Sequence, residues 1–107
     1  MESVHELARK ALDERWIPIR DAETVHGMLE IYDDTYCTFC EREKEICMDG
    51  AICKGCPLDG RDRKCCNGWT GIFYTAIRQE NIITACKAAG VICELLQALL
   101  DAPDYDW

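Results

Sequence analysis

The sequence predicts a mainly α fold, a small helical domain with a loop-rich metal-binding cysteine knuckle, on three observations. Apolar residues recur at helical spacing before and after the middle of the chain. Seven of the nine cysteines lie between Cys37 and Cys66. No segment carries a convincing strand pattern. The chain of 107 residues is long enough for one domain with a modest core, so we expect a single domain, 1–107.

Three parts of this domain differ in charge. The N-terminal helices, 1–36, carry nine acidic and four basic residues, and the cysteine-rich metal-binding segment, 37–66, carries six of each. The C-terminal helices and acidic tail, 67–107, carry five acidic and two basic residues, which brings the formal net charge to −8. A chain with acidic flanks is poorly suited to gripping phosphates, so nucleic acid is not the expected partner.

The first helix is expected over Val4–Arg15. Ser3 and Glu6 have the spacing of a capping box, in which each side chain bonds the other residue's backbone N–H. Pro18 follows soon after, and proline disfavours helical conformation in the residue before it. We therefore expect Trp16–Ile19 to be an extended connector that lies against the core.

The second helix is expected to begin after Asp21, a candidate N-cap with Thr24 close behind it. Asp33 and Asp34 mark its expected end, just before the first cysteine pair. The apolar stripe of this helix comprises Val25, Met28, Leu29 and Tyr32.

The sequence of the C-terminal third predicts that this part of the chain forms either a helical hairpin or one long helix. Thr70 can cap a helix over Gly71–Arg78, and Asn81 can cap a second one that Pro103 ends. Apolar residues then alternate at spacings of three and four, which indicates a helix packed along a long seam and allows a homodimer through this helix. The seam comprises Ile82, Cys86, Ala89, Cys93, Leu96 and Leu100, and its two cysteines are expected as small core residues.

Two C-x-x-C pairs with twelve residues between them dominate the middle of the chain. Each pair lets two sulfurs converge on one ion, and two pairs complete the tetrahedron that structural zinc prefers. The expected ligands are Cys37, Cys40, Cys53 and Cys56. Three further cysteines remain in the segment, and one of them could replace a member of this set; they are Cys47, Cys65 and Cys66.

Two other chemistries are open to these thiols. An iron–sulfur cluster also needs four thiolates, and Cys53-Lys-Gly-Cys56-Pro57 has the C-x-x-C-P end of a ferredoxin motif, although the full ferredoxin run is absent. A dithiol redox switch is the third hypothesis, but a thioredoxin-like fold needs strands that the sequence does not show. Zinc is the expected cofactor, with an iron–sulfur cluster as the alternative.

The sequence does not predict an enzyme. It contains no H-E-x-x-H motif, no glycine-rich phosphate loop and no Ser/His/Asp order. No apolar run is expected to span a membrane, and the N-terminus lacks the pattern of a signal peptide. The expected compartment is therefore the cytoplasm, where thiols stay reduced and dense cysteines more often hold metal than disulfides.

One resemblance rests on residues 37–69. The motifs Cys37-Thr-Phe-Cys40, Cys53-Lys-Gly-Cys56-Pro57-Leu58 and Cys66-Asn-Gly-Trp69 resemble the C-x-x-C, C-x-G-C-P and C-x-G patterns of small cysteine-rich phage and prophage proteins. The chain departs from that group in its longer spacer and its additional cysteines. The resemblance implies metal binding and a viral setting but no reaction, and it brings Cys66 forward as a ligand.

The acidic tail is the expected contact with a partner protein. Tyr105 and Trp107 are candidate anchors, and the aspartates around them supply steering charge. The expected function is a small acidic zinc-binding protein-interaction module. If the viral resemblance holds, it becomes an inhibitor of a host factor that normally binds nucleic acid. The alternatives are an iron–sulfur redox or sensor protein and a zinc-knuckle nucleic-acid binder that uses Lys54, Arg61, Arg63 and Lys64.

Overall fold

The computed structural model describes residues 3–35 and 66–106, and these two ranges are helical. The N-terminal range contains α1 (Val4–Ala11), the π-helical turn η1 (Leu12–Trp16), α2 (Ile17–Asp21) and α3 (Val25–Asp34). The C-terminal range contains α5 (Cys66–Arg78) and α6 (Ile82–Asp101). The prediction of a mainly helical protein is confirmed, whereas the cysteine knuckle lies outside the described residues.

The capping box at the start of α1 is confirmed. The backbone N–H of Glu6 donates to Ser3 Oγ at 3.2 Å, and the backbone N–H of Ser3 donates to Glu6 Oε2 at 3.4 Å. Val4, Leu7, Ala8 and Ala11 form the buried face of this helix.

The prediction of an extended connector at Trp16–Ile19 is wrong, because the helix continues through it. The N–H of Ile17 donates to the carbonyl of Leu12, five residues back, which widens the helix into the π-helical turn η1. Pro18 follows the widened turn directly, and such widened turns are one of the ways in which a helix accommodates a proline. Arg15 and Trp16, which both belong to this turn, are both buried.

The second helix begins one turn later than its first candidate cap. Asp21 ends α2, and Thr24 is the N-cap of α3, with its Oγ1 accepting from the N–H of Gly27 at 2.9 Å. A Cβ on Gly27 would lie 3.2 Å from that hydroxyl oxygen, so any larger residue would press on the cap. The expected end of the helix at Asp33 and Asp34 is confirmed.

The C-terminal third is a hairpin of α5 and α6. The N–H of Asn81 donates to the carbonyl of Ala76 and that of Glu80 to the carbonyl of Ile77, which is the Schellman pattern of helix ends. Glu80 adopts a positive φ of 55° at the position where glycine is most frequent. Asn81 then caps α6 by accepting from the N–H of Thr84 at 3.1 Å, as predicted.

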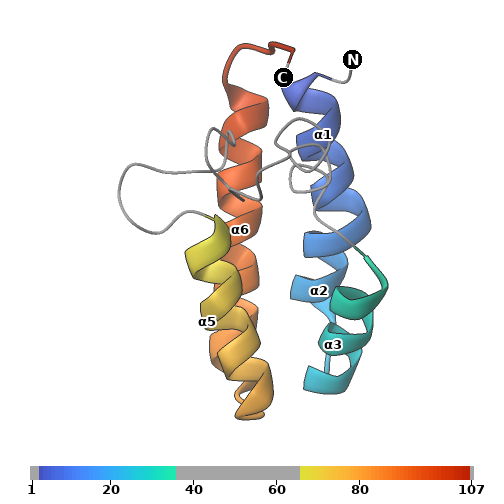
Figure 1. Cartoon of the computed structure of the whole chain (residues 1–107), viewed down its shortest axis with the longest axis vertical. Coiled ribbons are helices and arrows are strands. Elements are labelled where there is room, and N and C mark those ends of the chain that lie inside the picture. Colours follow the sequence, from blue (N-terminus) through green and yellow to red (C-terminus); the bar gives the residue numbers. More distant parts are fainter. Residues whose placement is uncertain (1–2, 36–65, 107) are drawn as a thin grey trace, which may run out of the picture.

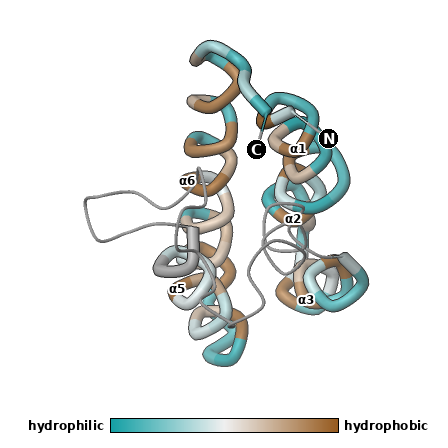
Figure 2. The backbone as a smooth tube through the Cα atoms, turned by 45° about the horizontal axis from the view of Figure 1, so that its top comes forward, coloured by the Kyte–Doolittle hydropathy of each residue, from teal (hydrophilic) through white to brown (hydrophobic). Residues whose placement is uncertain are grey.

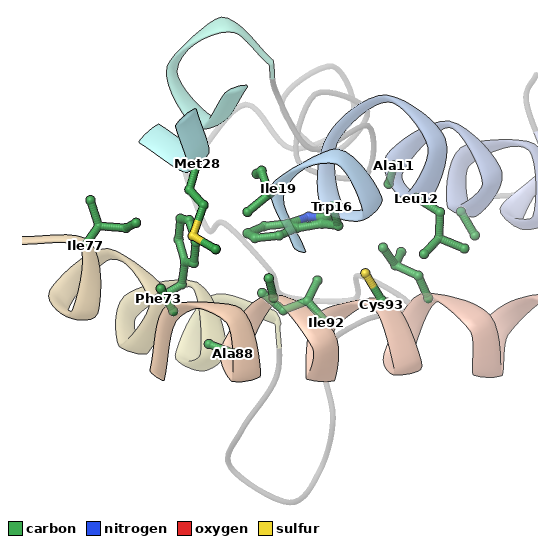
Figure 3. Close-up of a cluster of buried hydrophobic side chains, with 14 of the residues drawn as sticks. Ala11, Leu12, Trp16, Ile19, Met28, Phe73, Ile77, Ala88, Ile92 and Cys93 are labelled. Atoms are coloured by element: carbon green, nitrogen blue, oxygen red, sulfur yellow. The ribbon is translucent and has the colours of Figure 1, made fainter. Parts of the chain in front are cut away.

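The core lies where α6 passes between α5 on one side and the α1–η1–α2 helix on the other (Figure 1). Most of α6 is hydrophobic, whereas the side of α1 that faces away from α6 is hydrophilic (Figure 2). Figure 3 shows Trp16 and Phe73 meeting above α6, with Met28 entering from α3. Both rings are almost fully buried, with centroids 5.6 Å apart in an edge-to-face arrangement.

The expected seam of α6 is confirmed only in part. Its buried stripe follows the true helical period and comprises Ala85, Ala88, Ala89, Ile92, Cys93 and Leu96. Cys86 is exposed, because it lies to one side of this stripe, where its Sγ contacts the carbonyl of Arg20 at 3.5 Å. Ile83 is 73% exposed. The expectation that Cys86 is a core residue is therefore wrong, and for Cys93 it is confirmed.

This difference predicts unequal effects of two matched substitutions. Cys93→Ala is expected to lower the free energy of unfolding by about 1 kcal/mol, since it leaves a small cavity in the core. Cys86→Ala is expected to change it by less than about 0.5 kcal/mol, as for most surface substitutions. Urea unfolding of both variants measures the two values, and equal losses would contradict the packing of α6.

One sequence-based expectation about membranes also changes. By length and composition alone, α6 could cross a membrane, contrary to the expectation that no segment could. Core helices of soluble proteins pass the same test, and the buried stripe of α6 packs against the other helices of this chain.

Candidate functional site

The predicted ligand set falls mostly outside the described residues. Cys37, Cys40, Cys53 and Cys56 all lie there, as do Cys47 and Cys65. Cys66 is the first residue of α5, although its side chain is not described. The part of the chain that the structure describes contains no group of three His, Cys, Asp or Glu side chains that could hold a metal ion. The described residues therefore define the frame that flanks the segment.

The helices that flank the cysteine-rich segment, α3 and α5, run in opposite directions. In Figure 1, α3 rises and α5 descends, so the end of α3 and the start of α5 face the same way. The ring of Tyr32 on α3 lies 5.5 Å from that of Phe73 and 5.9 Å from that of Tyr74, both on α5. Thr35 is the C-cap of α3 and Cys66 is the first residue of α5, so the two residues belong to neighbouring helix ends that face the same way.

Arg15 fastens the end of α3. Its Nη1 donates to the carbonyl of Tyr32 at 3.0 Å, to the carbonyl of Thr35, and to Thr35 Oγ1 at 3.1 Å. The hydroxyl of Thr35 donates in turn to the carbonyl of Ile31 at 2.6 Å. Carbonyls at a helix C-terminus carry partial negative charge, so a guanidinium is the favoured partner there.

Two aromatic rings enclose the same guanidinium. Its Cζ lies 4.5 Å from the ring centroid of Tyr32 and 5.0 Å from that of Trp16, within the range of cation–π attraction. Only 6% of Arg15 is exposed, which is unusual for an arginine. Among the described residues, neither its Nε nor the indole Nε1 of Trp16 has a hydrogen-bond acceptor.

Sequence reasoning missed Arg15 because it placed this residue at the end of the first helix, before an extended connector. In that arrangement an arginine is an ordinary surface residue. The available signal was the apolar run Trp16-Ile17-Pro18-Ile19 directly after Arg15, which indicates that this part of the chain lies against the core.

The described part of the tail binds the first turn of α1. The carbonyl of Tyr105 accepts from the N–H of Val4 at 2.8 Å, and Asp104 Oδ1 accepts from the N–H of His5 at 3.0 Å. The Nε2–H of His5 donates to the carbonyl of Ala102 at 2.7 Å, since a carbonyl can only accept. The tail thus bonds helix donors that are otherwise left to solvent, while Tyr105 stays 51% exposed. Trp107, the other predicted anchor, lies outside the described residues.

Asp104 makes this attachment depend on pH. The N–H of His5 lowers the pKa of the Asp104 carboxyl, and Ser3, the charge of His5 and the N–H of Tyr105 act in the same direction. Because the folded pKa lies below the unfolded value of about 3.9, the carboxylate stabilises the fold above that pH. The contribution is lost as pH falls through the folded pKa.

The expected result is a pH-dependent effect of Asp104→Asn on melting temperature. The wild type should melt higher than the variant at pH 6, and the gap should close as pH falls below about 4. Thermal unfolding by circular dichroism over pH 2.5–7 (a range set by the unfolded value of about 3.9) measures it. A gap that stays constant with pH would contradict the bonding of this carboxylate to α1.

Comparison with protein-family models, curated proteins and solved structures finds no match for this chain.

Proposed function

We propose that this chain is a small acidic zinc-binding protein-interaction module. The observation that carries the proposal is the pair of C-x-x-C motifs, twelve residues apart, in a segment whose two flanking helices lie side by side. A metal bound within the segment would cross-link a loop that joins two helices in mutual contact, and the free energy of metal binding would then contribute to folding.

The proposed ligands are Cys37, Cys40, Cys53 and Cys56, with Cys66 as the alternative fourth ligand. Thiolates are the donors that structural zinc prefers, and four of them leave no open position for catalysis. The place of Cys66 at the start of α5 supports its inclusion, because the positive end of a helix dipole stabilises a thiolate. When bound, the metal would supply cross-linking and no reaction.

Protein recognition is proposed to involve the acidic tail. Its backbone is hydrogen-bonded to α1, while the ring of Tyr105 is exposed. Because the tail backbone is already ordered, a partner that binds this ring would cost the tail little further conformational entropy. Trp107 follows it in sequence, and the surrounding aspartates favour a basic partner. In the viral setting that the sequence resemblance implies, that partner is a host factor that normally binds nucleic acid, and the chain acts in the cytoplasm as its acidic decoy.

Metal analysis with a visible spectrum tests the metal half of this proposal. Protein purified without oxygen is expected to contain about one zinc ion per chain and no colour. Cys37→Ser and Cys56→Ser should lose the metal, whereas Cys86→Ser is the matched control and should keep it. If the analysis instead found iron with matching sulfide and visible absorption, the zinc hypothesis would be wrong and the iron–sulfur alternative would take its place.

Affinity capture tests the partner half. The immobilised full chain is expected to retain a basic protein, and Tyr105→Ala should weaken that retention without loss of metal. Recovery of nucleic acid with an affinity that falls steeply with salt would instead favour the nucleic-acid binder. The mass of the free chain in solution tests the predicted homodimer through α6.

A further inference from the structure

The side of α6 that faces away from the core is more apolar than packing within the chain requires. Of the most apolar window of 18 residues in this helix, only 33% are buried inside the chain. Ile83, opposite the buried stripe, is 73% exposed. The residues that follow it on this side at helical spacing are all exposed or half-buried, and together they form the outer face of α6. The outer face comprises Ile83, Lys87, Gly90, Glu94 and Ala98.

The charges of the outer face have twofold symmetry about Gly90. Lys87 lies three residues before Gly90, and Glu94 lies four residues after it. A rise of about 1.5 Å per residue places these two charges about 10 Å apart along the helix, and neither forms an ion pair among residues 3–35 and 66–106. In an antiparallel pair of α6 helices centred at Gly90, each Lys87 lies opposite Glu94 of the second copy. The same symmetry places each Ile83 opposite Ala98 of the second copy.

Gly90 has no packing role inside the described part of the chain. A Cβ on this residue would meet no neighbouring group within 4 Å. Glycine in a helix interior nevertheless costs about 1 kcal/mol relative to alanine. At a contact between two helices, glycine lets the two backbones approach closely, so its place at the centre of the outer face is suited to such a contact.

We propose that two copies of this chain pair antiparallel through the outer face of α6, with a twofold axis at Gly90 and reciprocal ion pairs between Lys87 and Glu94. The inference does not rest on zinc binding, and it names the face and the orientation of the homodimer predicted through α6. In a twofold pair every contact occurs twice, so one exposed base and one exposed acid supply two ion pairs. The only other charged residue of α6 is Asp101, so nearly all of the acidic residues behind the net charge of −8 belong to other segments.

The size of this interface predicts weak association. One helix face from each copy buries less than about 1,200 Å², which is typical of transient contacts. The pair is therefore expected in concentrated protein, whereas the chain is monomeric at the low concentrations of an unfolding experiment. Sedimentation equilibrium of the full-length chain under reducing conditions, at concentrations up to about 1 mM, measures dissociation constants in this range.

Charge reversal tests the orientation. Lys87→Glu and Glu94→Lys each replace both ion pairs by like-charge contacts, so each is expected to weaken the dimer about tenfold. The two variants change the net charge of the chain in opposite directions, so a loss in both cannot come from net charge. The double variant Lys87→Glu/Glu94→Lys restores both pairs with the signs exchanged and is expected to recover the wild-type dissociation constant. Arg9→Glu, on the exposed side of α1, is the matched control and should keep that constant.

Three results would overturn the pairing: unchanged association in both single variants, no recovery in the double variant, or an equal loss in Arg9→Glu. A wild type that stays monomeric at the highest concentration would overturn it as well, and its retention by phosphatidylcholine vesicles would then assign the outer face to a lipid surface. Bound zinc is measured in the same samples. A monomer that contains zinc would contradict the pairing alone, and a dimer without zinc would contradict the proposed zinc module alone.

Discussion

Trp16→Ala is expected to lower the free energy of unfolding by about 3–5 kcal/mol, which is the usual effect of removing a buried large aromatic ring. Trp16 is 1% exposed and contacts Phe73 edge to face, and its ring also lies 6.5 Å from that of Tyr32. A small domain has about 5–15 kcal/mol of stability in total, so this variant should lie close to unfolding at room temperature.

Urea unfolding followed by circular dichroism measures that loss, with Ile83→Ala as the control. Ile83 is apolar but 73% exposed, so its truncation is expected to change stability by less than about 0.5 kcal/mol. A loss below about 1 kcal/mol in Trp16→Ala would mean that the ring of Trp16 is not packed in the core as described.

Arg15→Met is expected to lower the free energy of unfolding by about 2–3 kcal/mol. Methionine retains much of the apolar stem, so the change removes mainly the guanidinium. The carbonyls of Tyr32 and Thr35 then lose a charged donor, and each such hydrogen bond contributes about 1.5–3 kcal/mol. The expected loss is close to the value of one such bond, although two carbonyls are affected, because the buried charge of Arg15 itself destabilises the fold and its removal offsets part of the loss.

Arg20→Met is the matched control for this prediction. Arg20 is exposed and pairs on the surface with its neighbour Asp21 at 3.0 Å. Surface pairs contribute about 0–1 kcal/mol, so its replacement should change stability little. Equal denaturation midpoints for Arg15→Met and the wild type would show that Arg15 does not hold the end of α3.

The helical fold was predictable because its signals are local. The capping box at Ser3 and the cap at Asn81 each lie within a few residues of the helix they start. The continuation through Pro18 was not predictable by the same means, since it depends on a widened turn that burial of Trp16 stabilises. The exposure of Cys86 was missed because Cys86 and Cys93 lie on nearly the same side of α6, and which of them is covered depends on the helices that pack there.

At the candidate site, too, one feature follows from a local sequence pattern and another depends on the fold. The C-x-x-C spacing of Cys37 and Cys40 is a local pattern, and it defines the metal hypothesis without any fold. The bonding of Arg15 to the end of α3 depends on a contact with Thr35, twenty residues further along the chain, which no local pattern encodes. That contact forms only when α3 lies beside η1 in the folded chain.

The tail also joins the two ends of the described chain. Ser3 and Asp106 form an antiparallel bridge, and Figure 1 shows both termini at the same pole of the molecule. A force or a bound protein that peels the tail away would first unzip this bridge and fray α1, before it reaches the buried rings. The same closeness suits circular permutation, in which a short linker joins the old ends and new ones open elsewhere.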